Sequence, residues 1–376
     1  MVLQKLFEKF QLPKLVFIAG VLLQILLLAP SAFANVSAPG GYGLKIYNVN
    51  SVLYPFVQVY FRTFNSEKQP LVNLNEMNIG LMVKGRTYDP MKRQYAIQSI
   101  RNRSDAVRSV IILDASKSML QNNAYLSTAQ AAARFIDAKR PQDEVAVLAI
   151  RDTKEGYDVI SNFERDPGAL ARRLADVKVD GMKSRIYDSI AAAMQMCAMS
   201  SQGSSIDPSV GNFLASCSIV IFSDGHDEGS ALSREELNAR ITSLSIPVPI
   251  YALAYGPSSR SHFVNLESIS KNSFGVYYLI GDTIDRMTRV VEEIQNILLS
   301  DYVVTFRSYE EVDGDMHALK IGVEYPTGSK KFTYDSSKFE AMEAPPIAEI
   351  DNAIRMLNQK MPPAPDGNPY FPARGQ

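Results

Sequence analysis

The chain has few of the residues that bind soft metals or brace small secreted domains. Its 376 residues include no tryptophan, three histidines and two cysteines. These five residues are His226, His262, His317, Cys197 and Cys217. They are too few and too scattered for a zinc ribbon, a zinc finger, a His-rich metal cage or a disulfide-dense scaffold. Any metal is therefore expected to be a hard cation held by oxygen.

An excess of charge of one sign is also absent. Lys and Arg number 39 and Asp and Glu number 40, which gives a formal net charge of -1. Phosphate binding relies on clustered Lys and Arg, and the sequence has no basic stripe, so we expect neither nucleic-acid binding nor coating of an anionic membrane. The hydrophobic fraction of 46% excludes a disordered chain, and the length favours two domains.

The amino end has the features of a targeting segment. Three lysines, an apolar run and a small-residue sequence follow one another there: Lys5, Lys9 and Lys14, then residues 15–28, then Ser31-Ala32-Phe33-Ala34. This order predicts a signal peptide over residues 1–34, cut after Ala34, and an exported protein that is periplasmic, cell-surface or secreted. The alternative is an uncleaved helix that tethers the chain to a membrane, because the run is about long enough to span a bilayer.

Two kinds of pattern alternate along the rest of the chain. Residues 43–101 and 302–334 have the short alternating runs and turns typical of antiparallel strands. From Ser109 to Asp301, continuously apolar runs alternate with amphipathic helices. The sequence therefore predicts an α/β fold with a doubly wound, mostly parallel sheet, flanked by β-strands that form a small β-sandwich. The runs 145–150 and 157–163 are joined by a short polar link, which favours an antiparallel hairpin at the sheet edge.

These patterns divide the chain into five predicted segments. They are the signal peptide (1–34), an N-terminal β segment (35–107), the α/β domain (108–301), C-terminal β-strands (302–340) and a Pro-rich flexible tail (341–376). The late strands are expected to pair with the early ones, so that the α/β unit is inserted into one sandwich or stacked on it. The tail has room for at most one short helix, near residues 347–360. Arg101, Arg103 and Arg108 are expected in a solvated linker.

Short oxygen-bearing side chains follow two of the predicted strands, at the point where each strand ends. Asp114, Ser116 and Ser118 stand directly after the run 110–113. Asp224 follows the run 219–222, and Ser184 lies in a loop before a predicted helix. The carboxyl ends of parallel strands meet at one edge of a sheet, so we expect these five oxygens to converge. They suit Mg²⁺, which prefers oxygen ligands, and two carboxylates only neutralise it, so it can still attract an acidic group from another molecule.

This arrangement is similar to the von Willebrand factor type A family and its metal-ion-dependent adhesion site, as found in exported bacterial proteins. The similarity covers residues 108–301 and includes, in the family's order, the Asp114-x-Ser116-x-Ser118 motif, the Ser184 loop and the Ser223-Asp224-Gly225 strand end. The resemblance implies Ser116 and Ser118 as direct ligands, Ser184 in the place of a ligand Thr, and Asp114 and Asp224 as carboxylates that bind directly or through water. A partner's Asp or Glu would complete the shell of Mg²⁺, or of Mn²⁺ or Ca²⁺.

Some residues depart from the family's pattern, and for others the sequence leaves two interpretations open. Ser184 replaces the usual Thr, and Lys117 stands where Gly is common, so its ammonium would have to point away from a cation. Cys197 and Cys217 are either core thiols or a disulfide that closes the loop between residues 200 and 216. His226, with the two acidic residues after it, is expected in a solvated loop.

The sequence carries none of the common catalytic motifs, such as G-x-S-x-G, a P-loop or H-E-x-x-H. The predicted function is therefore a non-enzymatic, exported adhesion module that captures an acidic side chain of a protein partner through the cation. Membrane contact is expected only through the N-terminal segment, if that segment stays uncleaved. One alternative is a metal-independent scaffold or assembly protein of the cell envelope. A less favoured one is a Mg²⁺-dependent phosphatase or phosphoryl transferase, because Ser116 stands where that chemistry needs a second carboxylate as proton donor.

Overall fold

The computed structural model describes residues 42–66, 69–202, 214–244, 246–255, 260–281 and 284–362. The predicted signal peptide lies outside these ranges. Within them, no helix is long and apolar enough to cross a membrane.

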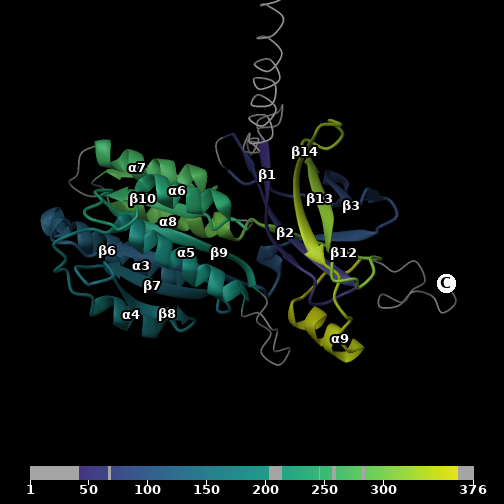
Figure 1. Cartoon of the computed structure of the whole chain (residues 1–376), viewed down its shortest axis with the longest axis horizontal. Coiled ribbons are helices and arrows are strands. Elements are labelled where there is room, and N and C mark those ends of the chain that lie inside the picture. Colours follow the sequence, from purple (N-terminus) through teal and green to yellow (C-terminus); the bar gives the residue numbers. More distant parts are fainter. Residues whose placement is uncertain are drawn as a thin grey trace, which may run out of the picture. The chain divides into compact units, whose positions relative to one another are not determined.

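A six-stranded sheet forms the centre of the α/β part (Figure 1). Its strand order is β11-β10-β9-β6-β7-β8. The strands are β6 (Ala106–Asp114), β7 (Glu144–Ile150), β8 (Tyr157–Glu164), β9 (Leu214–Ser223), β10 (Ile250–Tyr255) and β11 (Tyr277–Gly281). All neighbours are parallel except β7 and β8, which form the predicted antiparallel hairpin at the edge.

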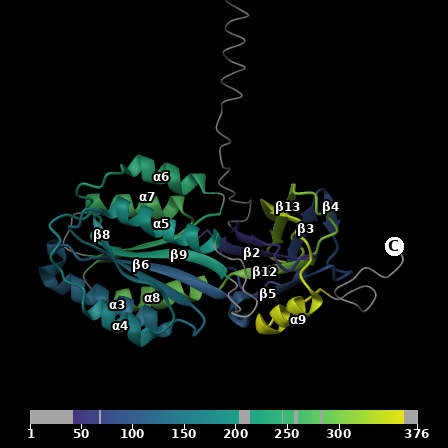
Figure 2. The same cartoon turned by 60° about the horizontal axis from the view of Figure 1, so that its bottom comes forward.

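Helices cover both faces of this sheet, as Figure 2 shows. One face carries α3 (Ala124–Ala138), α4 (Pro167–Ala175) and α8 (Ile284–Leu298), and the other carries α5 (Ile186–Gln202), α6 (Arg234–Ser243) and α7 (Arg260–Asn272). Successive side chains of a strand point to opposite faces. In β6, Ile111 and Leu113 pack into the first core, while Val110 and Ile112 pack into the second. This double burial explains the unbroken apolar runs and confirms the predicted α/β fold class.

The early and late strands pair with one another in two four-stranded antiparallel sheets. One has the order β1-β2-β12-β5, with β1 (Tyr42–Asn50), β2 (Phe56–Asn65), β5 (Tyr95–Ser99) and β12 (Tyr302–Arg307). The other has the order β14-β13-β3-β4, with β3 (Ile79–Val83), β4 (Arg86–Tyr88), β13 (Met316–Glu324) and β14 (Phe332–Glu340). Their inner side chains share one apolar core, so the sheets form a sandwich. Because β12 lies between β2 and β5, the α/β part is an insertion in this sandwich.

A buried ion pair ties the sandwich to the α/β part. Arg62 of β2 binds both carboxylate oxygens of Asp301, at 2.5 and 2.9 Å, and also donates to the hydroxyl of Tyr251 in β10. Both charged side chains are about 95% buried. Because the pair is buried, removal of either partner would leave the other as an unpaired buried charge between the sandwich and the α/β part.

Residues 347–362 were expected in a flexible tail with room for one short helix; the structure has that helix, and it packs onto the sandwich. Helix α9 (Ile347–Met356) packs Ile350 and Ala353 against Leu53 and Phe56, and Leu357, just after the helix, joins this cluster. The apolar residues of this segment fall on one helical face, and that face finds an apolar patch to cover. Residues 363–376 lie outside the described ranges.

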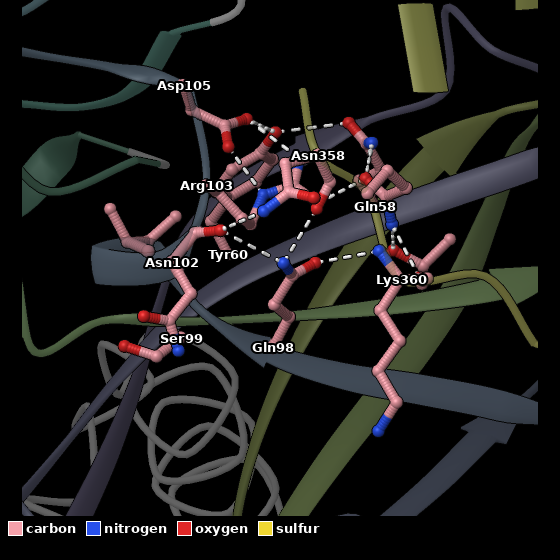
Figure 3. Close-up of polar contacts among 12 residues, drawn as sticks. Gln58, Tyr60, Gln98, Ser99, Asn102, Arg103, Asp105, Asn358 and Lys360 are labelled. Atoms are coloured by element: carbon pink, nitrogen blue, oxygen red, sulfur yellow. Dashed lines mark hydrogen bonds and ion pairs between the residues drawn. The ribbon is translucent and has the colours of Figure 1, made fainter. Parts of the chain in front are cut away.

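The expectation that Arg103 is solvated is wrong. Figure 3 shows its guanidinium bound to the carboxylate of Asp105, with Nη2 2.9 Å from Oδ1, and both side chains are fully buried. Tyr60 donates to the same carboxylate at 2.7 Å, and Gln359, beyond α9, accepts from both Arg103 and Gln58. The linker is therefore a buried polar joint that the C-terminal segment covers. Arg101 is exposed, as expected.

Candidate functional site

The five predicted oxygen side chains converge at the carboxyl ends of β6 and β9. Asp114, the last residue of β6, is fully buried. Its Oδ1 accepts hydrogen bonds from the backbone N–H of Ser116 at 3.1 Å and from the Ser184 hydroxyl at 3.3 Å. Its Oδ2 accepts a hydrogen bond of 2.9 Å from Ser223. Every one of these donors is neutral.

The remaining predicted residues continue this hydrogen-bonded chain. The hydroxyl oxygens of Ser116 and Ser118 lie 2.9 Å apart, and the Ser118 hydroxyl donates to Oδ2 of Asp224 at 3.4 Å. The other oxygen of Asp224 accepts from the backbone N–H of His226 at 3.1 Å. Ser118 is half-buried, whereas the other four site residues are buried, so the site meets solvent at Ser118.

Gly181 brings the Ser184 loop to the end of β6. Its carbonyl accepts from the N–H of Lys117 at 2.8 Å, and its own N–H donates to the carbonyl of Ala115 at 3.3 Å. A Cβ at this position would lie 3.3 Å from the Cα of Ser116. The two backbones can approach this closely because the residue is glycine.

Gly225 fixes the other side of the site. Its φ of +77° lies in the left-handed region, and a Cβ there would lie 2.8 Å from the carbonyl oxygen of His262. The turn allows Asp224 to follow β9 while His226 stacks on His262, with ring centroids 4.2 Å apart and planes 8° apart. Glycine is therefore required here for both conformation and space.

The electrostatics of the site favour a cation. Burial, and secondly the nearby carboxylate of Asp224, raise the pKa of Asp114 to about 6. In the described ranges, no three His, Cys, Asp or Glu side chains gather as a metal-binding group, so the donor set here is two carboxylates and three hydroxyls. That set matches the preference of Mg²⁺ and Ca²⁺ for oxygen ligands and offers little to soft metals.

Residues around the site show which neighbours are structural. The ammonium of Lys117 contacts the sulfur of Met182 at 3.0 Å and is exposed, so it points away from the carboxylates. Asp227, expected to be solvated, accepts from the N–H of Tyr187 at 3.2 Å in the first turn of α5. Asp188 accepts from the N–H groups of Ala231 and Leu232. These two carboxylates hold the loop after Asp224 against α5.

Sequence reasoning assigned no role to Ser223, yet its hydroxyl orients Asp114. The signal was present in the strand register. Leu113 pairs with Phe222 in parallel strands, so the next residue on each strand, Asp114 and Ser223, also lie side by side. The two glycines carried no comparable signal, because their role depends on how closely two loops approach.

Residues 109–226 match the family model described as von Willebrand factor type A domain. This range begins in β6 and includes all five site residues. This part of the chain is similar to a von Willebrand factor type A domain. The fold expected from the resemblance is therefore confirmed, and the metal-ion-dependent adhesion site within it stays a prediction.

Three solved structures are among those similar to this chain. The SpRpn10 VWA domain is 16% identical, with 50% of this chain and 94% of that chain covered and a TM-score of 0.36. The ArnB paralog VWA2 from Sulfolobus acidocaldarius is 12% identical, with 83% and 78% covered and a TM-score of 0.36. The human COPII-coat protein Sec24c is 8% identical, with 68% and 47% covered and a TM-score of 0.35. No curated protein sequence matches the chain.

Proposed function

We propose that this chain is an exported, non-enzymatic binding protein whose type A domain captures an acidic side chain of a protein partner through a divalent cation. The residues that would hold the cation are Asp114, Ser116, Ser118, Ser184 and Asp224. Mg²⁺ is the expected ion, with Mn²⁺ or Ca²⁺ as alternatives. Type A domains often mediate protein–protein interaction, which agrees with this proposal.

The observation that carries the proposal is the hydrogen-bonded cluster of these five side chains. Two carboxylates lie in it with little exposure and are linked through neutral hydroxyls. A bound divalent cation would supply the positive charge that this cluster lacks and an open position for one further carboxylate oxygen. The chain's own residues contribute a preformed set of oxygens, held by Ser223 and by the two close-approach glycines.

Two features support export. The N-terminal segment has the order of a signal peptide. Cys197 of α5 and Cys217 of β9 form a disulfide in the structure. Of the two predicted states of these cysteines, core thiols or a disulfide, the structure therefore shows the disulfide. Structural disulfides persist mainly in oxidising compartments, which favours a periplasmic, cell-surface or secreted protein.

The proposal is tested by metal binding and by partner capture with matched variants. Calorimetry measures the binding of Mg²⁺, Mn²⁺ and Ca²⁺ to the full chain, to its Asp114→Ala form and to an Asp137→Ala control. Asp137 is chosen as the control because it is an exposed carboxylate of α3 far in sequence from the site. Wild type and control should bind the ion, and Asp114→Ala should not. Partners captured with Mg²⁺ should be lost in EDTA and in Asp114→Ala.

The same samples separate the alternatives. Partners that stay bound in EDTA and to Asp114→Ala would support a metal-independent scaffold and overturn the metal bridge. Hydrolysis of a phosphate monoester that disappears in Asp114→Ala would support a phosphatase.

A further inference from the structure

A groove of roughly 810 Å³ runs along two strands of the sandwich, β1 and β14. These strands end their respective sheets and lie side by side (Figure 1). The groove is lined by four residues of β1 between Lys45 and Val49, by Ser51 just after this strand, and by every residue of β14 from Asp335 to Glu340. Six residues of extended chain span about 20 Å, so the groove has the length of a short extended segment.

The groove has an apolar surface that nothing in the described part of the chain covers. Met316 and Met82 come from the sandwich and Ile246 from the α/β part, and they are 55, 39 and 45% exposed. The outward-facing residues of β13 and β14 alternate with residues of the core, and Leu319 and Phe339 of that core also line the groove. Exposed apolar surface gathered in a concave site favours contact with another molecule.

Most of the charged residues in the groove lining are lysines. The lining includes Lys45, Lys84, Lys320 and Lys338 but only two carboxylates, Asp335 and Glu340. The groove therefore carries an excess of two positive charges, whereas the whole chain has a net charge of -1. A ligand that matches it has acidic groups at its sides and apolar groups toward its base.

One of the two carboxylates in the lining, that of Asp335, already binds groups of β1 and is not available to a ligand. Asp335 accepts the backbone N–H of Ile46 at 2.8 Å and pairs with Lys45 at 3.4 Å, which pins β14 to β1. Lys84 pairs with Glu310 at 3.1 Å, outside the lining. Lys320 lies over the ring of Tyr334, and Lys338 is exposed, so these two lysines of β13 and β14 present the charge most directly to an incoming segment.

We propose that this groove binds an extended segment of a partner protein in which acidic and apolar residues alternate. Alternation follows from the extended conformation, since successive side chains point to opposite sides. The proposal does not rest on the cation site, because none of the lining residues belongs to it.

The test measures binding of a fluorescent peptide in which Glu alternates with Val to the purified full chain, by anisotropy, against a peptide with Lys in place of Glu. The Lys320→Glu/Lys338→Glu form should weaken binding of the acidic peptide by about tenfold or more. The control, Lys92→Glu/Lys178→Glu, has the same charge change at exposed positions outside the groove and should bind as wild type does. Ala318→Trp, which fills the exposed groove without changing charge, should also weaken binding.

Several results would overturn the proposal. These are no saturable binding of the acidic peptide, equal binding of both peptides, or equal loss in the groove variant and its charge-matched control. Binding of heparin that outcompetes the peptide in wild type, and is lost in the groove variant, would assign the groove to a polyanion instead. Self-association of the full chain that disappears in Ala318→Trp would assign it to a second copy. Asp114→Ala should leave peptide binding unchanged, which separates this proposal from the metal bridge.

Discussion

The hydroxyl of Ser223 donates to Oδ2 of Asp114 across 2.9 Å, so the last residue of β9 holds the last residue of β6. The same hydroxyl accepts the N–H of Gly225 at 3.1 Å. One side chain thus orients the carboxylate and the turn that follows it, which makes Ser223 a positioning residue of the site.

Ser223→Ala should lower the free energy of unfolding by roughly 1–3 kcal/mol, because a buried carboxylate oxygen and a buried N–H each lose a partner. Mg²⁺ affinity should fall as well. Ser216→Ala on the same strand is the control, because its buried hydroxyl has no hydrogen-bond partner in the described part of the chain. That control should change stability little or raise it. Urea unfolding and calorimetry check both, and an equal effect of the two substitutions would contradict the role of Ser223.

Asp114→Asn should stabilise the chain in EDTA at neutral pH. Burial and Asp224 raise the pKa of Asp114 to about 6. The carboxylate of Asp114 therefore binds a proton more tightly in the folded state than in the unfolded state. The stability linked to this group is therefore present below about pH 4 and is lost as the pH rises through about 6. Asparagine lacks the charge, so its stability profile in EDTA should be flatter over that range.

Mg²⁺ provides the second arm of this experiment. It should raise the melting temperature of wild type at neutral pH and leave that of Asp114→Asn unchanged. A parallel rise in both would mean that the ion binds elsewhere.

Gly225→Ala should destabilise the chain more than Gly85→Ala. Both glycines have a positive φ, of +77° and +81°, and an alanine at either pays roughly 1 kcal/mol or more for that conformation. At Gly225 the new Cβ would also lie 2.8 Å from the carbonyl oxygen of His262, whereas at Gly85 nothing lies within 4 Å. The difference between the two unfolding free energies measures the close approach beside the site, and no difference would show that the loop yields freely.

Arg62→Met should cost about 3–5 kcal/mol, because it leaves the carboxylate of Asp301 buried without its partner. Removing both charges in Arg62→Met/Asp301→Leu should restore part of that loss. Urea titration of the three proteins checks the order of stability. If the double substitution is as destabilising as the two single effects added together, the pair is not coupled as the structure indicates.

The sequence was sufficient for those features that depend on local pattern. The apolar runs predict the doubly wound sheet, because a strand covered on both faces must be apolar throughout. Asp114 and Asp224 follow two such runs, and parallel pairing brings their ends together. What could not be predicted depends on distant partners. Arg103 is buried because Gln359, 256 residues away, covers it. The apolar face of α9 is buried only because it packs against Leu53 and Phe56.

The position of β12 between β2 and β5 has a consequence for the order in which the chain folds. The sheet that begins at Tyr42 cannot be completed until Tyr302 has been made, so its first strands must wait while the whole α/β part is synthesised. Pairings so distant in sequence form slowly, because the intervening loop has to close first. Folding of the α/β part shortens that loop, because the segments before β6 and after α8 meet where the N–H of Ile100 donates to the carbonyl of Asp301 at 2.8 Å. Folding of the α/β part therefore helps the sandwich that supports it to assemble.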